Sequence, residues 1–153
     1  MKRILYIILS FFIIILSTGC EYTPIEENEE LPYTADFLKT EIILDYDGSP
    51  LLAVTLNWHN GSMDKTTSFQ DELQCVAFQD GIELETAYFN DMEYYPILSQ
   101  NYNMRDNAIR PGIALEVTIF YEVRNTDSPI EIEIVERISI KDIIINKTIH
   151  NFE

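Results

Sequence analysis

Cysteine, histidine and basic residues are scarce in this sequence. Two cysteines, Cys20 and Cys75, and two histidines, His59 and His150, occur among its 153 residues. Two cysteines cannot form the dense disulfide framework that holds many small secreted domains together. A zinc site would have to recruit carboxylates from scattered positions, because so few histidines and cysteines are available. We therefore expect a domain without disulfides, without a metal ion and without a cofactor.

The shortage of basic residues gives the chain a strongly negative charge. The chain has ten lysines and arginines but 26 aspartates and glutamates, which gives a formal net charge of -16. If Lys2 and Arg3 are removed with an export signal, eight basic residues remain against 26 acidic ones, a net charge of -18. Such a surface repels phosphate backbones, which excludes nucleic acid as a partner. It would also keep its distance from anionic lipid or wall polymer unless cations intervene.

The first 20 residues have the pattern of an export signal. The basic start Met1-Lys2-Arg3 precedes an apolar stretch over residues 4–16. As a helix this stretch would reach about 20 Å, short of a hydrocarbon core of ~30 Å, which favours a signal peptide over a permanent membrane span. The following Leu16-Ser17-Thr18-Gly19-Cys20 resembles the lipobox of bacterial lipoproteins, with small residues before a cysteine. An uncleaved membrane anchor is the alternative.

This resemblance implies a domain organisation and a location. Residues 1–19 would be the signal peptide, cleaved before Cys20, and Cys20 would carry the lipid. Residues 20–32 are rich in glutamate and contain two prolines, so we expect a disordered, self-repelling tether. Residues 33–153 are left for one folded domain. The protein would lie on the extracytoplasmic face of the cell membrane and contact that membrane through its lipid.

The pattern after residue 33 has a period of two, which predicts an all-β fold. Residues 130–134 alternate isoleucine with glutamate, the pattern of a strand with one wet face. Further strands are expected near 42–44, 51–56, 73–79, 82–88, 117–123 and 138–145. Asp80-Gly81 is a strong hairpin signal, and residues 45–50 are rich in turn formers. About seven short antiparallel strands without a helix of three turns favour a β-sandwich.

Several segments of the domain resemble a known family. They are residues 54–60 (VTLNWHN), 67–69 (TSF), 77–84 (AFQDGIEL), 109–112 (IRPG) and 128–132 (SPIEI). Together they make residues of roughly 40 to 137 similar to domain of unknown function 5067, which is found in lipoproteins of Gram-positive bacteria. The resemblance implies an immunoglobulin-like sandwich, similar to telokin-like and immunoprotective extracellular antigen domains. It implies no activity and no functional residues.

Possible catalytic residues concentrate between residues 59 and 68. Ser62 and Lys65 fit the Ser-x-x-Lys pattern of penicillin-recognising enzymes, but no Lys-Thr-Gly follows and the motif lies in a polar loop. His59 and Asp64 with Ser62 or Ser68 could nominally form a triad, but no Gly-x-Ser-x-Gly elbow frames either serine. We therefore expect no enzyme activity and assign no catalytic residue.

Two further residue patterns have plainer interpretations. Asp45-x-Asp47-Gly48 has the start of a calcium loop without its later ligands, and a hairpin turn is the simpler interpretation. Cys75 lies within a predicted strand, where it is best explained as a small buried side chain rather than a reactive thiol.

Residues 88–104 (YFNDMEYYPILSQNYNM) form the segment richest in tyrosine. Tyrosine offers contact area and a hydroxyl at low entropic cost, which suits recognition surfaces. Tyr94, Tyr95 and Tyr102 are the candidate partner-binding residues, with Asp91 and Glu93 supplying negative charge for a cationic partner. The alternative is that these aromatic residues cap the open end of the sandwich.

These observations favour a lipid-anchored, surface-exposed, non-enzymatic binding or accessory module. Its ligand would be an unknown protein, peptide or wall component. The alternative function is an immunity or inhibitor lipoprotein that binds a secreted toxin or hydrolase at the cell surface.

Overall fold

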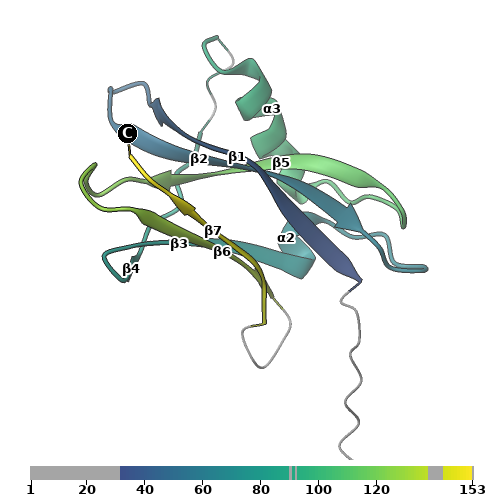
Figure 1. Cartoon of the computed structure of the whole chain (residues 1–153). Helices are drawn as coiled ribbons and strands as arrows, with labels where there is room; N and C mark the ends of the chain where they lie inside the picture. Colours follow the sequence, from purple (N-terminus) through teal and green to yellow (C-terminus); the bar gives the residue numbers. More distant parts are fainter. Residues whose placement is uncertain (1–31, 90, 92, 138–142, 153) are drawn as a thin grey trace, which may run out of the picture. The chain divides into compact units, whose positions relative to one another are not determined.

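The computed structural model describes residues 32–89, 91, 93–137 and 143–152, and these contain two antiparallel sheets packed face to face (Figure 1). All of these residues belong to one compact unit, 31–153. The predicted export signal, Cys20 and most of the predicted tether lie outside the described residues. The elements, in chain order, are β1 (Tyr33–Leu44), β2 (Pro50–Asn60), α2 (Phe69–Glu72), β3 (Leu73–Gln79), β4 (Ile82–Glu83), α3 (Pro96–Asn103), the 3-10 helix η1 (Met104–Asp106), β5 (Ala114–Glu122), β6 (Ile130–Glu136) and β7 (Ile144–His150).

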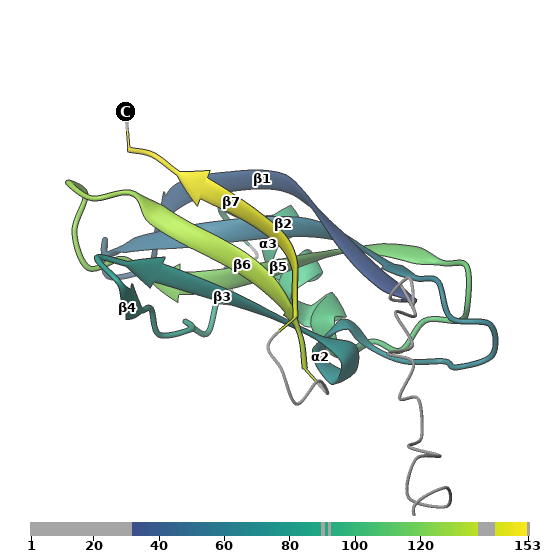
Figure 2. The ribbon, with the colours of Figure 1, turned by 60° about the horizontal axis from the view of Figure 1, so that its bottom comes forward.

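The two sheets have the strand orders β1-β2-β5 and β4-β3-β6-β7. Figure 2 shows them as two layers, with β3, β6 and β7 in front of β1, β2 and β5. All strand pairs are antiparallel. This arrangement confirms the predicted all-β sandwich of about seven strands.

The two hairpin turns also form as predicted. In the first turn, Asp45 Oδ1 accepts hydrogen bonds from the backbone N–H of Asp47 (2.9 Å) and Ser49 (2.7 Å). In the second turn, Asp80 and Gly81 have φ values of 55° and 73°. A positive φ at both central residues is the geometry of a type I′ hairpin turn, which Asp-Gly favours.

The sandwich core consists of the inward-facing side chains of both sheets. Leu52, Val54, Leu56 and Trp58 alternate along β2, with outward side chains between them. The isoleucines of β6 meet them from the other sheet; these are Ile130, Ile132 and Ile134, all fully buried. A hydrogen bond also joins the layers, because Tyr121 Oη of β5 donates to the carbonyl oxygen of Cys75 on β3 at 2.7 Å.

The segment after β4 departs from the sequence-based expectation. A strand was expected over residues 82–88, but β4 ends at Glu83. The chain then crosses to the other sheet, where Ala87 N donates to Phe120 O (2.8 Å) and Glu85 O accepts from Glu122 N (2.9 Å). These bonds satisfy the outer edge of β5, which explains why the segment leaves β3.

The last strand is displaced along the sequence relative to the prediction. It was expected over residues 138–145, whereas β7 spans Ile144–His150. Residues 138–142 lie outside the described residues. Within the described ranges, no helix is long and apolar enough to cross a membrane.

Candidate binding groove

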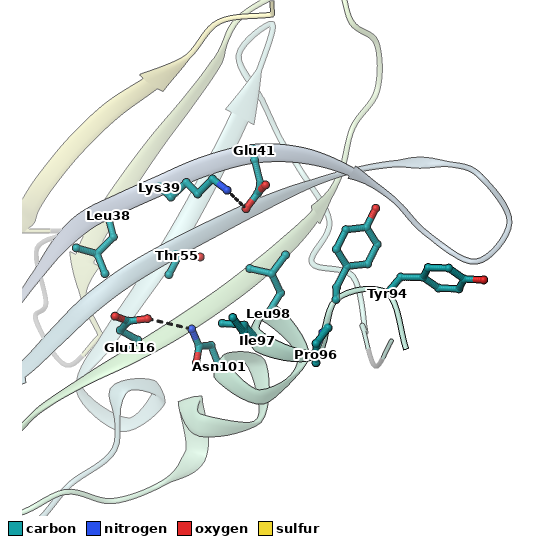
Figure 3. A pocket seen from close by; sticks show the side chains of 11 residues that line it. Leu38, Lys39, Glu41, Thr55, Tyr94, Pro96, Ile97, Leu98, Asn101 and Glu116 are labelled. Atoms are coloured by element: carbon teal, nitrogen blue, oxygen red, sulfur yellow. Dashed lines mark hydrogen bonds and ion pairs between the residues drawn. The ribbon is translucent and has the colours of Figure 1, made fainter. Parts of the chain in front are cut away.

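A groove with a volume of about 490 Å³ lies on the outer face of the three-stranded sheet, beside α3 (Figure 3). Helix α3 packs chiefly against β5 and less against β2. The β1 side of the same face is therefore left uncovered next to the helix. The groove is lined by Leu38, Lys39, Glu41, Thr55, Tyr94, Tyr95, Pro96, Ile97, Leu98, Asn101 and Glu116.

The two apolar walls come from β1 and α3. On β1 the register against β2 shifts between Phe37 and Lys39, which is a β-bulge. A bulge changes the direction of a side chain, and Leu38 at this position is 52% exposed. On α3, Ile97 is 69% exposed. Neither residue was predicted from the sequence as part of a site. The sequence feature that could have indicated Leu38 is the pair Phe37-Leu38, where two apolar residues interrupt the alternation of apolar and polar residues along this strand.

Each charged side chain of the groove has a polar partner within the groove. Lys39 Nζ lies 2.8 Å from Glu41 Oε1. Asn101 Nδ2 donates to Glu116 Oε2 at 3.3 Å, which links α3 to β5. The groove therefore carries two carboxylates and one ammonium group, and that ammonium group is already neutralised by Glu41.

Helix α3 is held in place by a second apolar cluster on the outer face of the sheet. The rings of Phe89 and Tyr102 pack on Phe120, with centroid distances of 4.3 and 5.5 Å. The guanidinium group of Arg105 stacks on the Tyr102 ring at 3.8 Å. Because Phe120 is fully buried, these contacts fix the helix against β5 and keep the groove open on its other side.

Hydrogen bonds also order the segment that enters α3. Asp91 Oδ1 accepts from the backbone N–H groups of Glu93 (3.1 Å) and Tyr94 (3.0 Å). Asp91 N donates in turn to Oγ of the buried Ser99 at 2.9 Å. Pro96, at the start of α3, has a φ angle already suited to a helix. The position of Tyr94 on the groove rim is thus set by its backbone.

The structure separates the three tyrosines singled out by the sequence. Tyr94 is 73% exposed and lines the groove. Tyr95 also lines the groove but is half-buried, with its ring 5.8 Å from that of Phe89. Tyr102 is buried beneath α3, with only 8% of its surface exposed. Two of the three candidates therefore share a surface, and the third belongs to the packing that supports it.

Ser62 and Lys65 do not form a nucleophile–base pair. Ser62 Oγ donates to Asn60 Oδ1 (2.7 Å) and to the Lys65 carbonyl oxygen (3.0 Å). Lys65 Nζ pairs instead with the buried Glu72 carboxylate at 2.5 Å. This hydrogen bond raises the pKa of Lys65 above its ordinary value, whereas a lysine base needs a lowered pKa.

The other candidate residues have structural contacts of their own. Ser68 caps α2, since its Oγ accepts from Asp71 N and donates to Asp71 Oδ2. Cys75 is a buried free thiol, as predicted, and burial raises its pKa to about 12. In the part of the chain that the structure describes, no three acidic, histidine or cysteine side chains are placed to hold a metal ion.

The family model described as "Domain of unknown function (DUF5067)" matches residues 25–136. The chain belongs to this family. The match spans both sheets up to β6 and includes every residue that lines the groove. The DUF5067 description carries no activity or ligand.

A solved structure has a similar fold to this DUF5067 chain. It is that of a "putative lipoprotein" from Staphylococcus aureus subsp. aureus NCTC 8325, with a TM-score of 0.59 and 15% sequence identity. The similarity covers 79% of this chain and 84% of the staphylococcal one. A search of curated proteins gives no match.

Proposed function

We propose that this chain is a lipid-anchored, surface-exposed, non-enzymatic binding module, and that the groove beside α3 is its binding surface. The groove is the observation that carries the proposal. Its volume of about 490 Å³ falls within the range of ligand sites in proteins, about 300–1,000 Å³. Its walls combine exposed apolar side chains with a few polar groups, which is the usual composition of a recognition surface.

The anchor part of the proposal rests on the N-terminal sequence. Cys20 follows an apolar stretch and three small residues, as in a lipobox. The similarity to a staphylococcal protein named as a "putative lipoprotein" supports the same interpretation. A lipid on Cys20 and an acidic tether would hold the groove outside the membrane surface.

The groove is tested by photo-crosslinking in the native cells. A photoreactive p-benzoylphenylalanine is placed at Ile97 in the groove wall, and in a matched strain at Ile144 on β7, which is 50% exposed. We expect an adduct of defined mass from the groove position that the β7 position does not give. The same adduct from both positions, or none from the groove, would contradict the proposal.

The anchor is tested separately with Cys20→Ala. This change should abolish labelling by a fatty-acid probe and leave the precursor uncleaved or released from the membrane. Unchanged labelling of the variant would remove the lipid from the proposal.

Identification of the crosslinked partner also separates the two candidate functions, because a secreted toxin or hydrolase would support the immunity or inhibitor role.

A further inference from the structure

The apolar part of the groove is exposed yet already ordered. Leu38, Tyr94 and Ile97 are each more than half exposed, and all three line one hollow. Apolar side chains gathered around a concave surface mark an interaction site more often than scattered ones do. The helix wall is fixed by the packing of Tyr102 and Phe89 on Phe120. A ligand that binds here does not have to order the site first, which favours affinity.

The charge around this hollow selects the sign of the partner. Glu41 and Glu116 line the groove together with one lysine, Lys39, which pairs with Glu41, so the lining keeps a net charge of -1. The loop before α3 adds Asp91 and Glu93. Over the whole chain, acidic residues outnumber basic ones 26 to 10. An acidic partner would be repelled by this surface, whereas a cationic one would be attracted to it.

The same charges argue against two other occupants of the groove. A second copy of the chain would bring an equally negative surface against the groove. The chain's own residues 21–30 are rich in glutamate and would meet Glu41 and Glu116 with like charge.

We propose that the groove binds a polypeptide segment of a cationic partner, with an apolar side chain between Leu38 and Ile97 and lysine or arginine side chains on Glu41 and Glu116. This proposal rests on the proposed function and names the partner class of the same groove. The apolar contact supplies affinity, and the carboxylates supply selectivity and a faster association.

The test uses the full lipid-bearing chain in a nonionic detergent and three fluorescein-labelled nonapeptides. The first peptide alternates lysine with leucine, the second glutamate with leucine, and the third lysine with serine. Fluorescence anisotropy is measured against the detergent alone as a blank. We expect the lysine–leucine peptide to bind at least about tenfold more tightly than either of the others, since it alone supplies both contacts.

Charge variants locate the carboxylates responsible. The double variant Glu41→Gln with Glu116→Gln should weaken binding of the lysine–leucine peptide by about tenfold and reduce its dependence on salt. The matched control is Glu131→Gln with Glu133→Gln, which removes two carboxylates from β6 that pair with Lys147 at 2.7 and 2.9 Å. This control has the same net charge as the groove variant and should bind almost as tightly as the unmodified chain.

Apolar variants locate the hydrophobic contact. Leu38→Ser with Ile97→Ser should also weaken the lysine–leucine peptide by about tenfold. Ile144→Ser, at a similarly exposed site on β7, should leave its affinity unchanged. All the changed side chains are at least partly exposed, so we expect each variant to fold. Thermal melts of the variants check this.

The outcomes distinguish this inference from the proposed function. Equal binding of the lysine–leucine and glutamate–leucine peptides would overturn the inference and leave an apolar binding site without charge selection. The inference would also be overturned if no peptide bound, or if the groove variants left the binding unchanged. The proposed function would still be tested by the crosslink from the groove in cells. A dimer in sedimentation that Leu38→Ser with Ile97→Ser dissolves would overturn it in favour of a second copy.

Discussion

At the scale of single residues, Gln79 at the end of β3 organises the loop that follows β5. Its side chain is fully buried. Nε2 donates to the carbonyl oxygens of Asn125 and Ser128, each at 2.9 Å, and Oε1 accepts from the N–H groups of Arg124 and Asn125 at 3.0 and 3.3 Å. Gln79→Leu would leave these backbone groups without their partner. We expect the free energy of unfolding in urea to fall by roughly 3 kcal/mol.

The control for this prediction lies on the same strand. Gln74 is exposed, so Gln74→Leu should change the free energy of unfolding by less than about 0.5 kcal/mol. An equal loss in both variants would mean that the hydrogen bonds of Gln79 do not carry the effect.

Cys75 makes the stability of the fold depend on pH in the alkaline range. Burial raises the pKa of its thiol from 9.0 to about 12, so the folded chain keeps this proton across a pH range in which the unfolded chain loses it. Because the unfolded state then binds fewer protons, stability falls as pH rises above about 9. Between pH 8 and pH 10 the unmodified chain should lose about 1.4 kcal/mol more than Cys75→Ala does. Urea melts at the two pH values measure this difference, and equal losses would contradict it.

At the scale of elements, α3 has one face that supports the fold and one that lines the groove. Tyr102 is buried against Phe120, so Tyr102→Ala should lower the free energy of unfolding by about 3 kcal/mol. Tyr94 is 73% exposed, so Tyr94→Ala should leave it within about 0.5 kcal/mol of the unmodified value. Thermal melts compare the two variants. Equal destabilisation would mean that both tyrosines belong to the core, and Tyr94 would then not be available to a partner.

The strands could be predicted from the sequence because their signals are local. The isoleucine–glutamate alternation of β6 places its apolar side chains on one face whatever the neighbouring strand is. Asp80 and Gly81 determine their turn by their own backbone preferences. Helix α3 could not be predicted in this way, because eight residues form a stable helix only through packing, here of Tyr102 on Phe120.

The groove was only partly predictable for a related reason. Tyr94 and Tyr95 were found by composition, since the segment around them is rich in tyrosine. Leu38 and Glu116 come from β1 and β5, which are far apart in the sequence and are joined through β2. Bringing them to one surface requires the sheet order, the register and the bulge at Leu38, and none of these is a local property.

At the scale of the whole molecule, the contacts that join the two sheets lie within the residues that the structure describes. Both sheets, the Tyr121–Cys75 hydrogen bond between them and the α3 cluster lie after residue 32. The carbonyl oxygen of Pro32 accepts from Gly61 N at 2.7 Å, so this residue already contacts the folded unit. No disulfide contributes, because Cys75 is the one cysteine in residues 32–153.

We therefore predict that residues 32–153, expressed alone, fold into the same sandwich and stay folded in reducing buffer. The far-ultraviolet dichroism spectrum should be of β type. The chain has one tryptophan, and Trp58 is fully buried in the core, so its fluorescence should be blue-shifted and should move to longer wavelength in a single urea transition. The midpoint should be the same with and without dithiothreitol, because the thiol of Cys75 is already free. A helix-dominated spectrum, or unfolding by reductant alone, would contradict the prediction.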